Sequence, residues 1–140
     1  MFNALIPELA VRDCATSLRF YRDVLGFSVV YERPEEGFAF LQLGAAQLML
    51  DQIGAGRTFG AVELDTLLGQ GLNLQITAAS LDPMLAAMVL ANIALFLPLE
   101  VRSYRRGESA LLQRQFVVAD PDGYLLRFCE SPRAVAATPL

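Results

Sequence analysis

The side chains that could do chemistry in this chain are carboxylates, arginines and two cysteines, because the 140 residues include no histidine. This excludes catalytic triads built on an imidazole base and removes the commonest metal ligand. Cys14 and Cys129 are too few for a tetrathiolate zinc site. A helix start can activate a thiol, as is conceivable for Cys14, but such a cysteine is more often a small buried residue.

Seven residues are candidates for binding a ligand, because they bring charge, amide groups or large polarisable surface to expected strands. They are Glu8, Phe38, Phe40, Met49, Asp51, Asn73 and Arg127. Side chains two residues apart share one face of a strand. This alternation pairs Met49 with Asp51 and Phe38 with Phe40, so each pair either lines a cleft or faces the core.

Arg127 interrupts an otherwise apolar strand formed by Leu125, Leu126 and Phe128. A buried arginine must be paired, and Asp51 or Glu8 is a candidate partner. Arg127 could therefore have either of two roles, as a member of a structural ion pair or as an anchor for a ligand. Phe38 and Phe40 are stacking platforms if their face lines a cleft, and core residues otherwise.

Composition narrows the class of protein. Hydrophobic residues make up 54% of the chain and the net charge is −4, which argues against intrinsic disorder. A pI near 4.7 and the lack of lysine argue against nucleic-acid binding, which needs clustered basic side chains.

The uncharged run from Pro83 to Leu99 is shorter than the roughly 20 residues of a membrane span. Met1–Asp13 has no basic leader and contains Glu8, so we expect a cytoplasmic protein with reduced thiols.

The expected elements repeat in the two halves of the chain. Asp13 is a helix N-cap and Gly26 ends the same helix. The strands of the first half are expected at Leu5–Arg12, Phe27–Arg33, Phe38–Leu43 and Gln47–Ile53. In the second half a strand at Gly71–Thr77 and an apolar helix at Leu81–Ile93 are followed by strands at Phe96–Tyr104, Leu111–Ala119 and Tyr124–Glu130.

These elements predict an α+β fold in which two βαβββ modules form cupped mixed sheets with one helix each. The single domain, residues 1–140, would consist of modules at about 5–53 and 70–130, a glycine-rich connector at 54–69 and a loose tail at 131–140. Asp120-Pro121-Asp122-Gly123 has the residue types of a hairpin turn and is assigned no catalytic role.

Two segments of the chain resemble the vicinal-oxygen-chelate superfamily, the group of glyoxalases, bleomycin-resistance proteins and extradiol dioxygenases. The first is the run Val11-Arg12-Asp13, Ser17-Leu18-Arg19-Phe20-Tyr21 and Val24-Leu25-Gly26-Phe27. The second is Asp120-Pro121-Asp122-Gly123-Tyr124-Leu125-Leu126, which is similar to the closing hairpin of that group. The resemblance implies paired βαβββ modules, a homodimer, and sites within the cupped sheets.

Enzymes of this superfamily hold a divalent metal through one side chain on each of four strands. The resemblance places these positions at Ile6, Asp51, Asn73 and Arg127. Isoleucine cannot coordinate a metal, and a guanidinium places a positive charge where the cation would lie. We therefore expect no metal and no other cofactor.

The chain is most similar to the metal-free bleomycin-resistance type. Leu41-Gln42-x-Gly44, Leu48-Met49-Leu50-Asp51 and the arginine after the closing turn resemble that type. The resemblance implies a homodimer that sequesters a small-molecule ligand, such as a cationic antibiotic, in a dimer cleft without changing it. The apolar Leu81–Ile93 helix also suggests a covering partner chain.

Other functions stay open at this stage. The chain has no tryptophan, and Arg105 and Arg106 would repel a polycationic drug. One alternative is a metal-independent enzyme with Asp51 or Glu8 as general base and Arg127 as electrostatic stabiliser. Another is a non-catalytic interaction module.

Overall fold

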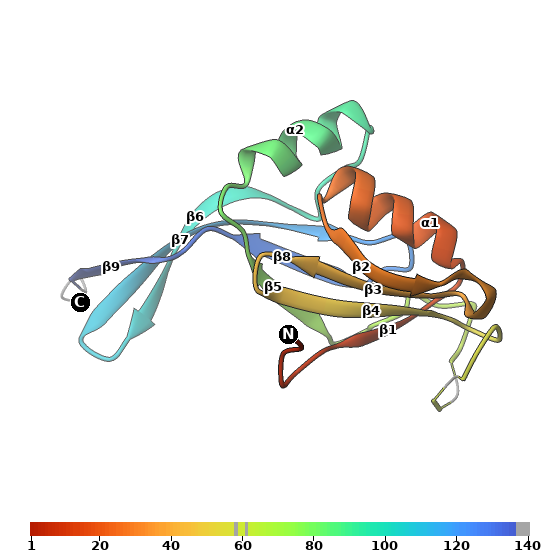
Figure 1. The fold of residues 1–140 in the computed structure, drawn as a ribbon. Coiled ribbons are helices and arrows are strands. Elements are labelled where there is room, and N and C mark those ends of the chain that lie inside the picture. Colours follow the sequence, from red (N-terminus) through yellow and green to blue (C-terminus); the bar gives the residue numbers. More distant parts are fainter. Residues whose placement is uncertain (58, 61, 137–140) are drawn as a thin grey trace.

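The computed structural model describes residues 1–57, 59–60 and 62–136 as two mixed sheets beneath two helices (Figure 1). The first sheet has the strand order β1-β4-β3-β2. The second has the order β5-β8-β7-β6, and β9 adds to it by pairing with β7. The predicted α+β class with two mixed sheets is confirmed.

The first sheet and its helix are built from residues 8–52. The elements are β1 (Glu8–Val11), α1 (Cys14–Leu18), the π-helical turn η1 (Arg19–Val24), β2 (Ser28–Arg33), the short helix η2 (Pro34–Glu36), β3 (Phe38–Leu43) and β4 (Ala46–Gln52). Phe20 and Tyr21 face the core while Arg19 and Arg22 are exposed, which is the amphipathic pattern of a surface helix. β1 runs parallel to β4, because a helix and two strands separate them in the chain.

The second sheet repeats this plan and extends it. Its elements are β5 (Asn73–Thr77), α2 (Asp82–Leu90), β6 (Leu97–Arg106), β7 (Ser109–Ala119), β8 (Leu125–Cys129) and β9 (Arg133–Ala136). β5 is parallel to β8, whereas the pairs β6–β7 and β7–β8 are antiparallel.

Three elements differ most from the sequence-based expectation. Strand β1 was expected to start at Leu5 but begins at Glu8. Helix α2 ends at Leu90 rather than Ile93, because Asn92 adopts a left-handed backbone with a φ of 54°, which asparagine tolerates. The tail was expected to be loose over 131–140, but Arg133–Ala136 forms β9, which pairs with Ser109–Leu112. The expected loose residues 137–140 lie outside the described residues.

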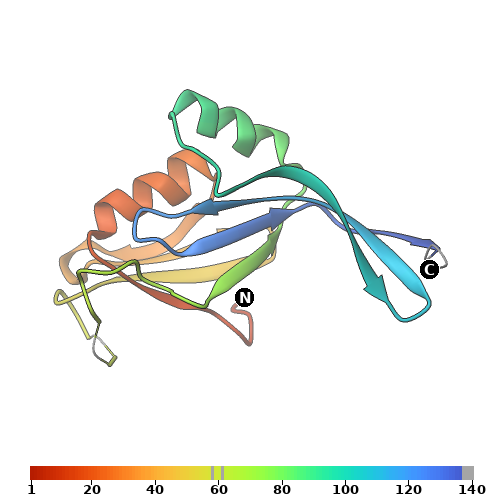
Figure 2. The same ribbon diagram turned by 180° about the vertical axis from the view of Figure 1, so that it is seen from behind.

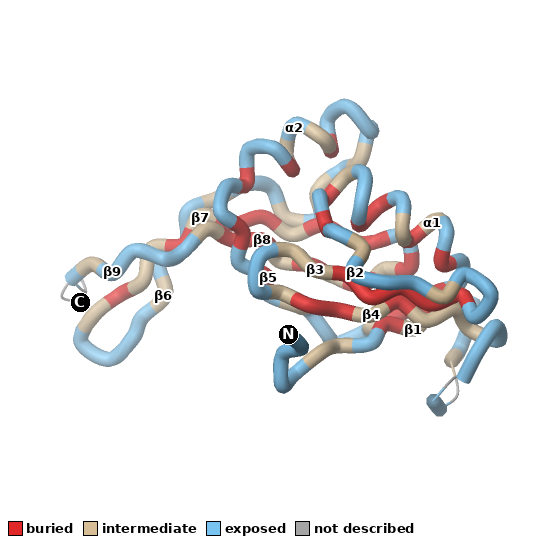
Figure 3. The backbone as a smooth tube through the Cα atoms, viewed as in Figure 1, coloured by how far each residue is buried: buried red, intermediate tan, exposed pale blue. Residues whose placement is uncertain are grey.

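The far ends of β6 and β7, together with β9, extend away from the rest of the molecule, as Figure 2 shows. We call residues 103–112 with β9 the arm. Gly107 closes its hairpin with a φ of 59°, a left-handed conformation that glycine adopts without strain. Most of the arm is exposed, whereas buried segments gather in the strands below the helices (Figure 3).

Both helices cover the same side of the two sheets, and the core lies between helices and strands (Figure 1). Large buried side chains from both halves of the chain meet there. They include Leu9, Val11, Tyr21, Leu50, Leu81, Met88, Phe116, Leu126 and Phe128. Among the described residues no helix is long and apolar enough to cross a membrane.

Candidate functional site

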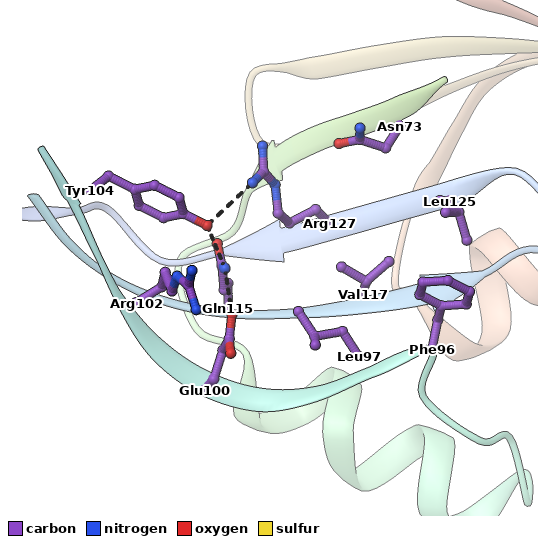
Figure 4. Close-up of a pocket in the computed structure, with 10 residues that line it drawn as sticks. All are labelled: Asn73, Phe96, Leu97, Glu100, Arg102, Tyr104, Gln115, Val117, Leu125 and Arg127. Carbon is purple, nitrogen blue, oxygen red and sulfur yellow. Dashed lines mark hydrogen bonds between the residues drawn. The ribbon is translucent and has the colours of Figure 1, made fainter. Parts of the chain in front are cut away.

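The face of the second sheet turned away from the helices carries a cavity of about 440 Å³. On β8, Leu126 and Phe128 are fully buried in the core, so the intervening Arg127 points to the opposite face. We call this cavity the second-sheet cup. Its lining residues, drawn in Figure 4, are Asn73, Phe96, Leu97, Glu100, Arg102, Tyr104, Gln115, Val117, Leu125 and Arg127.

One end of the cup is polar and carries a chain of hydrogen bonds. The Nε2 atom of Gln115 donates to Glu100 Oε1 over 2.9 Å and to the Tyr104 hydroxyl oxygen over 2.7 Å (Figure 4). Gln115 Oε1 in turn accepts a 2.7 Å hydrogen bond from Gln113 Nε2. Gln113 and Gln115 are buried, so these bonds fix the amide orientations at the base of the cup.

Arg127 extends into this polar end without an acidic partner. Its Nη1 atom donates a long hydrogen bond of 3.4 Å to the Tyr104 hydroxyl, and its buried Nε atom has no hydrogen-bond partner among the described residues. The expected ion pair with Asp51 or Glu8 is not formed: in the described chain no carboxylate lies within 4.0 Å of Arg127. The sheets hold these side chains apart, because Asp51 lies on β4 and Arg127 on β8.

The other end of the cup is apolar. Leu97, Val117 and Leu125 come from three neighbouring strands, β6, β7 and β8. Phe96 stands at the rim with 68% of its surface exposed. An apolar wall opposite a few oriented polar groups is the usual construction of a small-molecule site.

Glu8 and Asp51 meet on the first sheet rather than in this cup. With Ala10 and Phe59 they line a separate hollow of about 90 Å³. Desolvation, followed by repulsion from Asp51, raises the pKa of Glu8 above its usual value. The hollow therefore holds a pair of carboxylates, and a bound cationic group would reduce the repulsion between them.

Phe38 and Phe40 lie on the same sheet face but are covered by other aromatic rings. Phe40 is 1% exposed, stacks with Tyr31 at a centroid distance of 5.3 Å and meets Phe2 edge-on at 5.2 Å. The Arg33 guanidinium lies 3.9 Å from the centre of the Phe38 ring. A ligand would reach these rings only after Phe2 or Tyr31 moved. Met49, half-buried on β4, lies opposite both Phe40 and Glu8 in the sheet register.

Sequence reasoning missed most of the second-sheet cup. Of the seven candidates, only Asn73 and Arg127 line it. Glu100, Arg102 and Tyr104 alternate along β6, and this period of two is visible in the sequence once that strand is assigned. Gln115 and Val117 alternate in the same way along β7.

Cys14 is buried rather than activated at its helix start. Burial raises the pKa of its thiol, and nearby carboxylates raise it further. Cys129 is also free and buried. The Cys14 thiol therefore lacks the lowered pKa of a nucleophile that its helix start could have provided.

The residues at the expected metal positions do not fit a metal. Ile6 precedes β1 and has no donor atom, Asp51 lies in the first-sheet hollow, and Arg127 brings a positive charge to the second-sheet cup. No group of three or more histidine, cysteine, aspartate or glutamate side chains that could hold an ion occurs in the described part of the chain.

Residues 4–86 match the family model described as Glyoxalase/Bleomycin resistance protein/Dioxygenase superfamily. The chain belongs to this superfamily. The matched range covers the first sheet, β5 and part of α2, whereas most residues of the second-sheet cup follow it. A comparison with curated proteins finds no significant match.

The chain is also similar to several solved structures. TioX from Micromonospora sp. ML1 is 20% identical, with 92% of this chain and 98% of that chain covered and a TM-score of 0.70. A protein of unknown function from Agrobacterium tumefaciens str. C58 is 24% identical, with 94% of this chain and 95% of that chain covered and a TM-score of 0.65. A superfamily member from Vibrio splendidus 12B01 is 38% identical over 90% of this chain and 97% of that chain, with a TM-score of 0.40.

Proposed function

We propose that this superfamily member is a small-molecule-binding protein of the bleomycin-resistance type, which sequesters a ligand without a metal or another cofactor. The observation that carries the proposal is the second-sheet cup, where an apolar wall faces a fixed polar network and Arg127 occupies the last expected metal position. A guanidinium there supports ligand recognition and opposes cation chemistry.

A metal-independent enzyme is the second candidate, and the raised pKa of Glu8 favours it, because general bases work best when their pKa lies near the operating pH. Such a mechanism would need Glu8 or Asp51 beside the stabilising Arg127. The hollow with the two carboxylates and the cup with Arg127 share no lining residue. Within one chain, the separation of the two carboxylates from Arg127 therefore favours ligand sequestration over catalysis.

The antibiotic-resistance role proposed from the resemblance would use the first-sheet hollow for a cationic group. Glu8 and Asp51 supply its negative charge, and screening by salt would weaken that attraction. Arg105 and Arg106 lie on the exposed arm and line neither the hollow nor the cup. Arg102, from the same strand, lines the cup instead.

We also propose that the protein is a homodimer in the cytoplasm. Val89 and Leu90 at the end of α2 are 80% and 89% exposed, and Val101 on β6 is 66% exposed. Exposed apolar side chains grouped in this way are typical of an interface. The two free, buried cysteines fit a reducing compartment.

A thermal-shift screen of bleomycin-type drugs and other small organic molecules tests the function, with mass spectrometry of the recovered ligand. A ligand present at a hundred times its dissociation constant should add about 2.7 kcal/mol to the free energy of unfolding. We expect at least one compound to stabilise chelator-treated protein and to be recovered unchanged. Turnover of the compound, or stabilisation that needs added Zn²⁺, Ni²⁺, Fe²⁺ or Mn²⁺, would contradict the proposal.

A matched pair of substitutions places the binding site. Val117→Phe inserts a ring into the second-sheet cup, whereas Val135→Phe adds the same ring to β9, outside the cup. We expect the first change to abolish the ligand-induced shift and the second to leave it intact. If both variants kept the ligand-induced thermal shift, the ligand would bind outside the second-sheet cup.

A further inference from the structure

We propose that the second-sheet cup selects an organic carboxylate with an apolar body. This inference rests on the proposed function and names its class of ligand. It follows from the direction of the hydrogen bonds at the polar end, from the charges there, and from the apolar wall opposite.

The hydrogen-bond network fixes which way its groups face. The Glu100 carboxylate can only accept, so the amide of Gln115 must present its NH₂ group to Glu100. The same NH₂ group donates its other proton to the Tyr104 hydroxyl oxygen, 2.7 Å away. Arg127 Nη1 can also only donate to this oxygen. Tyr104 thus accepts from both neighbours, and its own O–H proton is left to donate to a ligand.

Arg127 adds a fork of donors beside that hydroxyl. Its Nε atom is buried without an acceptor, and the only side-chain hydrogen bond of Arg127 within the described chain is the 3.4 Å contact with Tyr104. An unmet buried donor costs free energy that a bound acceptor would recover. The planar guanidinium matches the two oxygens of a carboxylate, which it can bind in a bidentate manner.

The charges at this end favour an anion. Arg102 and Arg127 both line the cup, and neither has a carboxylate within 4.0 Å among the residues described. Glu100 is the one carboxylate among the described lining residues, and its Oε1 atom already accepts from Gln115. A bound cation would therefore face two guanidinium groups, whereas a bound monoanion would be attracted by the excess positive charge.

The apolar end determines the rest of the ligand. Leu97, Val117 and Leu125 form a wall that removes hydrocarbon from water, and Phe96 offers a ring face at the rim (Figure 4). A cavity of about 440 Å³ lies within the range of small-molecule sites. An aromatic or branched body carrying one carboxylate fills both ends, whereas a small inorganic anion leaves the wall uncovered.

Calorimetric titration with three probes of one shape tests this inference. The probes are 4-phenylbutyrate, the neutral 4-phenylbutyramide and the cationic 4-phenylbutylamine, titrated into the chelator-treated full chain. We expect the carboxylate to bind at least about ten-fold more tightly than the amide, as for charge-assisted hydrogen bonds. The amine should bind more weakly than the amide.

Three variants connect the preference to the cup. Arg127→Gln and Tyr104→Phe should each weaken binding of the carboxylate and change binding of the amide by less than about two-fold. Arg105→Gln, which removes the same charge from the exposed arm, should leave both affinities unchanged. Binding of the amide by Arg127→Gln also shows that this variant is folded.

Equal affinities for carboxylate and amide, or no binding of either, would overturn the carboxylate inference. An unchanged carboxylate affinity in Arg127→Gln would overturn it as well. Such results are separate from failure of the proposed function, which would appear as chemical change of the probe or as a metal requirement. Carboxylate selectivity together with turnover would support this inference and contradict sequestration.

Discussion

The Tyr21 hydroxyl donates a 2.8 Å hydrogen bond to Oδ2 of Asp120, a buried carboxylate 99 residues further along the chain. Oδ1 of the same carboxylate accepts from the backbone amides of Asp122 and Tyr124. The adjacent Asp122 forms an ion pair of 3.1 Å with Arg12. The Asp-Pro-Asp-Gly turn of the second half is therefore a connection between the two halves, and it supports the β8 strand that carries Arg127.

Tyr21→Phe should lower the free energy of unfolding by about 2 kcal/mol, because a hydrogen bond to a charged group is lost and Asp120 stays buried. Urea denaturation measures the loss. Tyr31→Phe is the control, since Tyr31 is 40% exposed, and it should change stability by less than about 0.5 kcal/mol. Equal stability of Tyr21→Phe and the wild type would show that the connection contributes nothing.

Arg127→Met should raise the free energy of unfolding by about 1 kcal/mol, because it removes a buried donor that has no partner. The matched control is Arg114→Met on the neighbouring strand. Arg114 forms ion pairs of 2.6 Å with Glu130 and 2.8 Å with Asp82, so its replacement should lower stability. A loss of stability in Arg127→Met would mean that the arginine is structural.

Asp51→Asn should lower the pKa of Glu8 toward its ordinary value, because repulsion from Asp51 and the hydrogen bond with it both raise that pKa. Carboxyl NMR titration measures the change. In the wild type, a cation should bind the first-sheet hollow more strongly as the pH rises through the raised pKa, since Glu8 then becomes charged. Glu108→Gln on the arm removes one charge elsewhere, and it should leave the Glu8 titration as it was. A Glu8 pKa that does not respond to Asp51→Asn would contradict the acidic pair.

The protein should sediment at twice the 15.3 kDa mass of one chain at micromolar concentration. Leu90→Glu should shift it toward the monomer by placing a charge on the exposed end of α2. Leu64→Glu makes the same change at another exposed leucine, in the connector, and should leave the dimer intact. A wild-type monomer under these conditions would refute the dimer proposal.

Hydrophobic patterning predicted most of the strands and the first helix, because burial alternates along strands such as β1 and β8 and the helix has a clear apolar stripe. The end of α2 was missed, since Asn92 stops the helix through its own backbone conformation. Strand β9 was missed because its four residues gain their stability from pairing with β7 rather than from their own pattern.

The site was predicted in part, for a similar reason. Glu8 and Asp51 were separate candidates in the sequence, and they line one hollow because β1 and β4 pair directly. The expectation that either would pair with Arg127 was wrong, since the distance between two sheets is not encoded in any local pattern. Tyr104 and Gln115 became candidates only when the β6–β7 register placed their strands side by side.

Chemical-shift mapping on ¹⁵N-labelled, chelator-treated protein tests the central claim, that the second-sheet cup binds an organic ligand without a metal. Titration with 4-phenylbutyrate should shift the backbone amides of Tyr104, Gln115, Val117 and Arg127 with no metal added. Shifts that appear only after a divalent metal is supplied, or that appear only around Glu8 and Asp51, would contradict the claim.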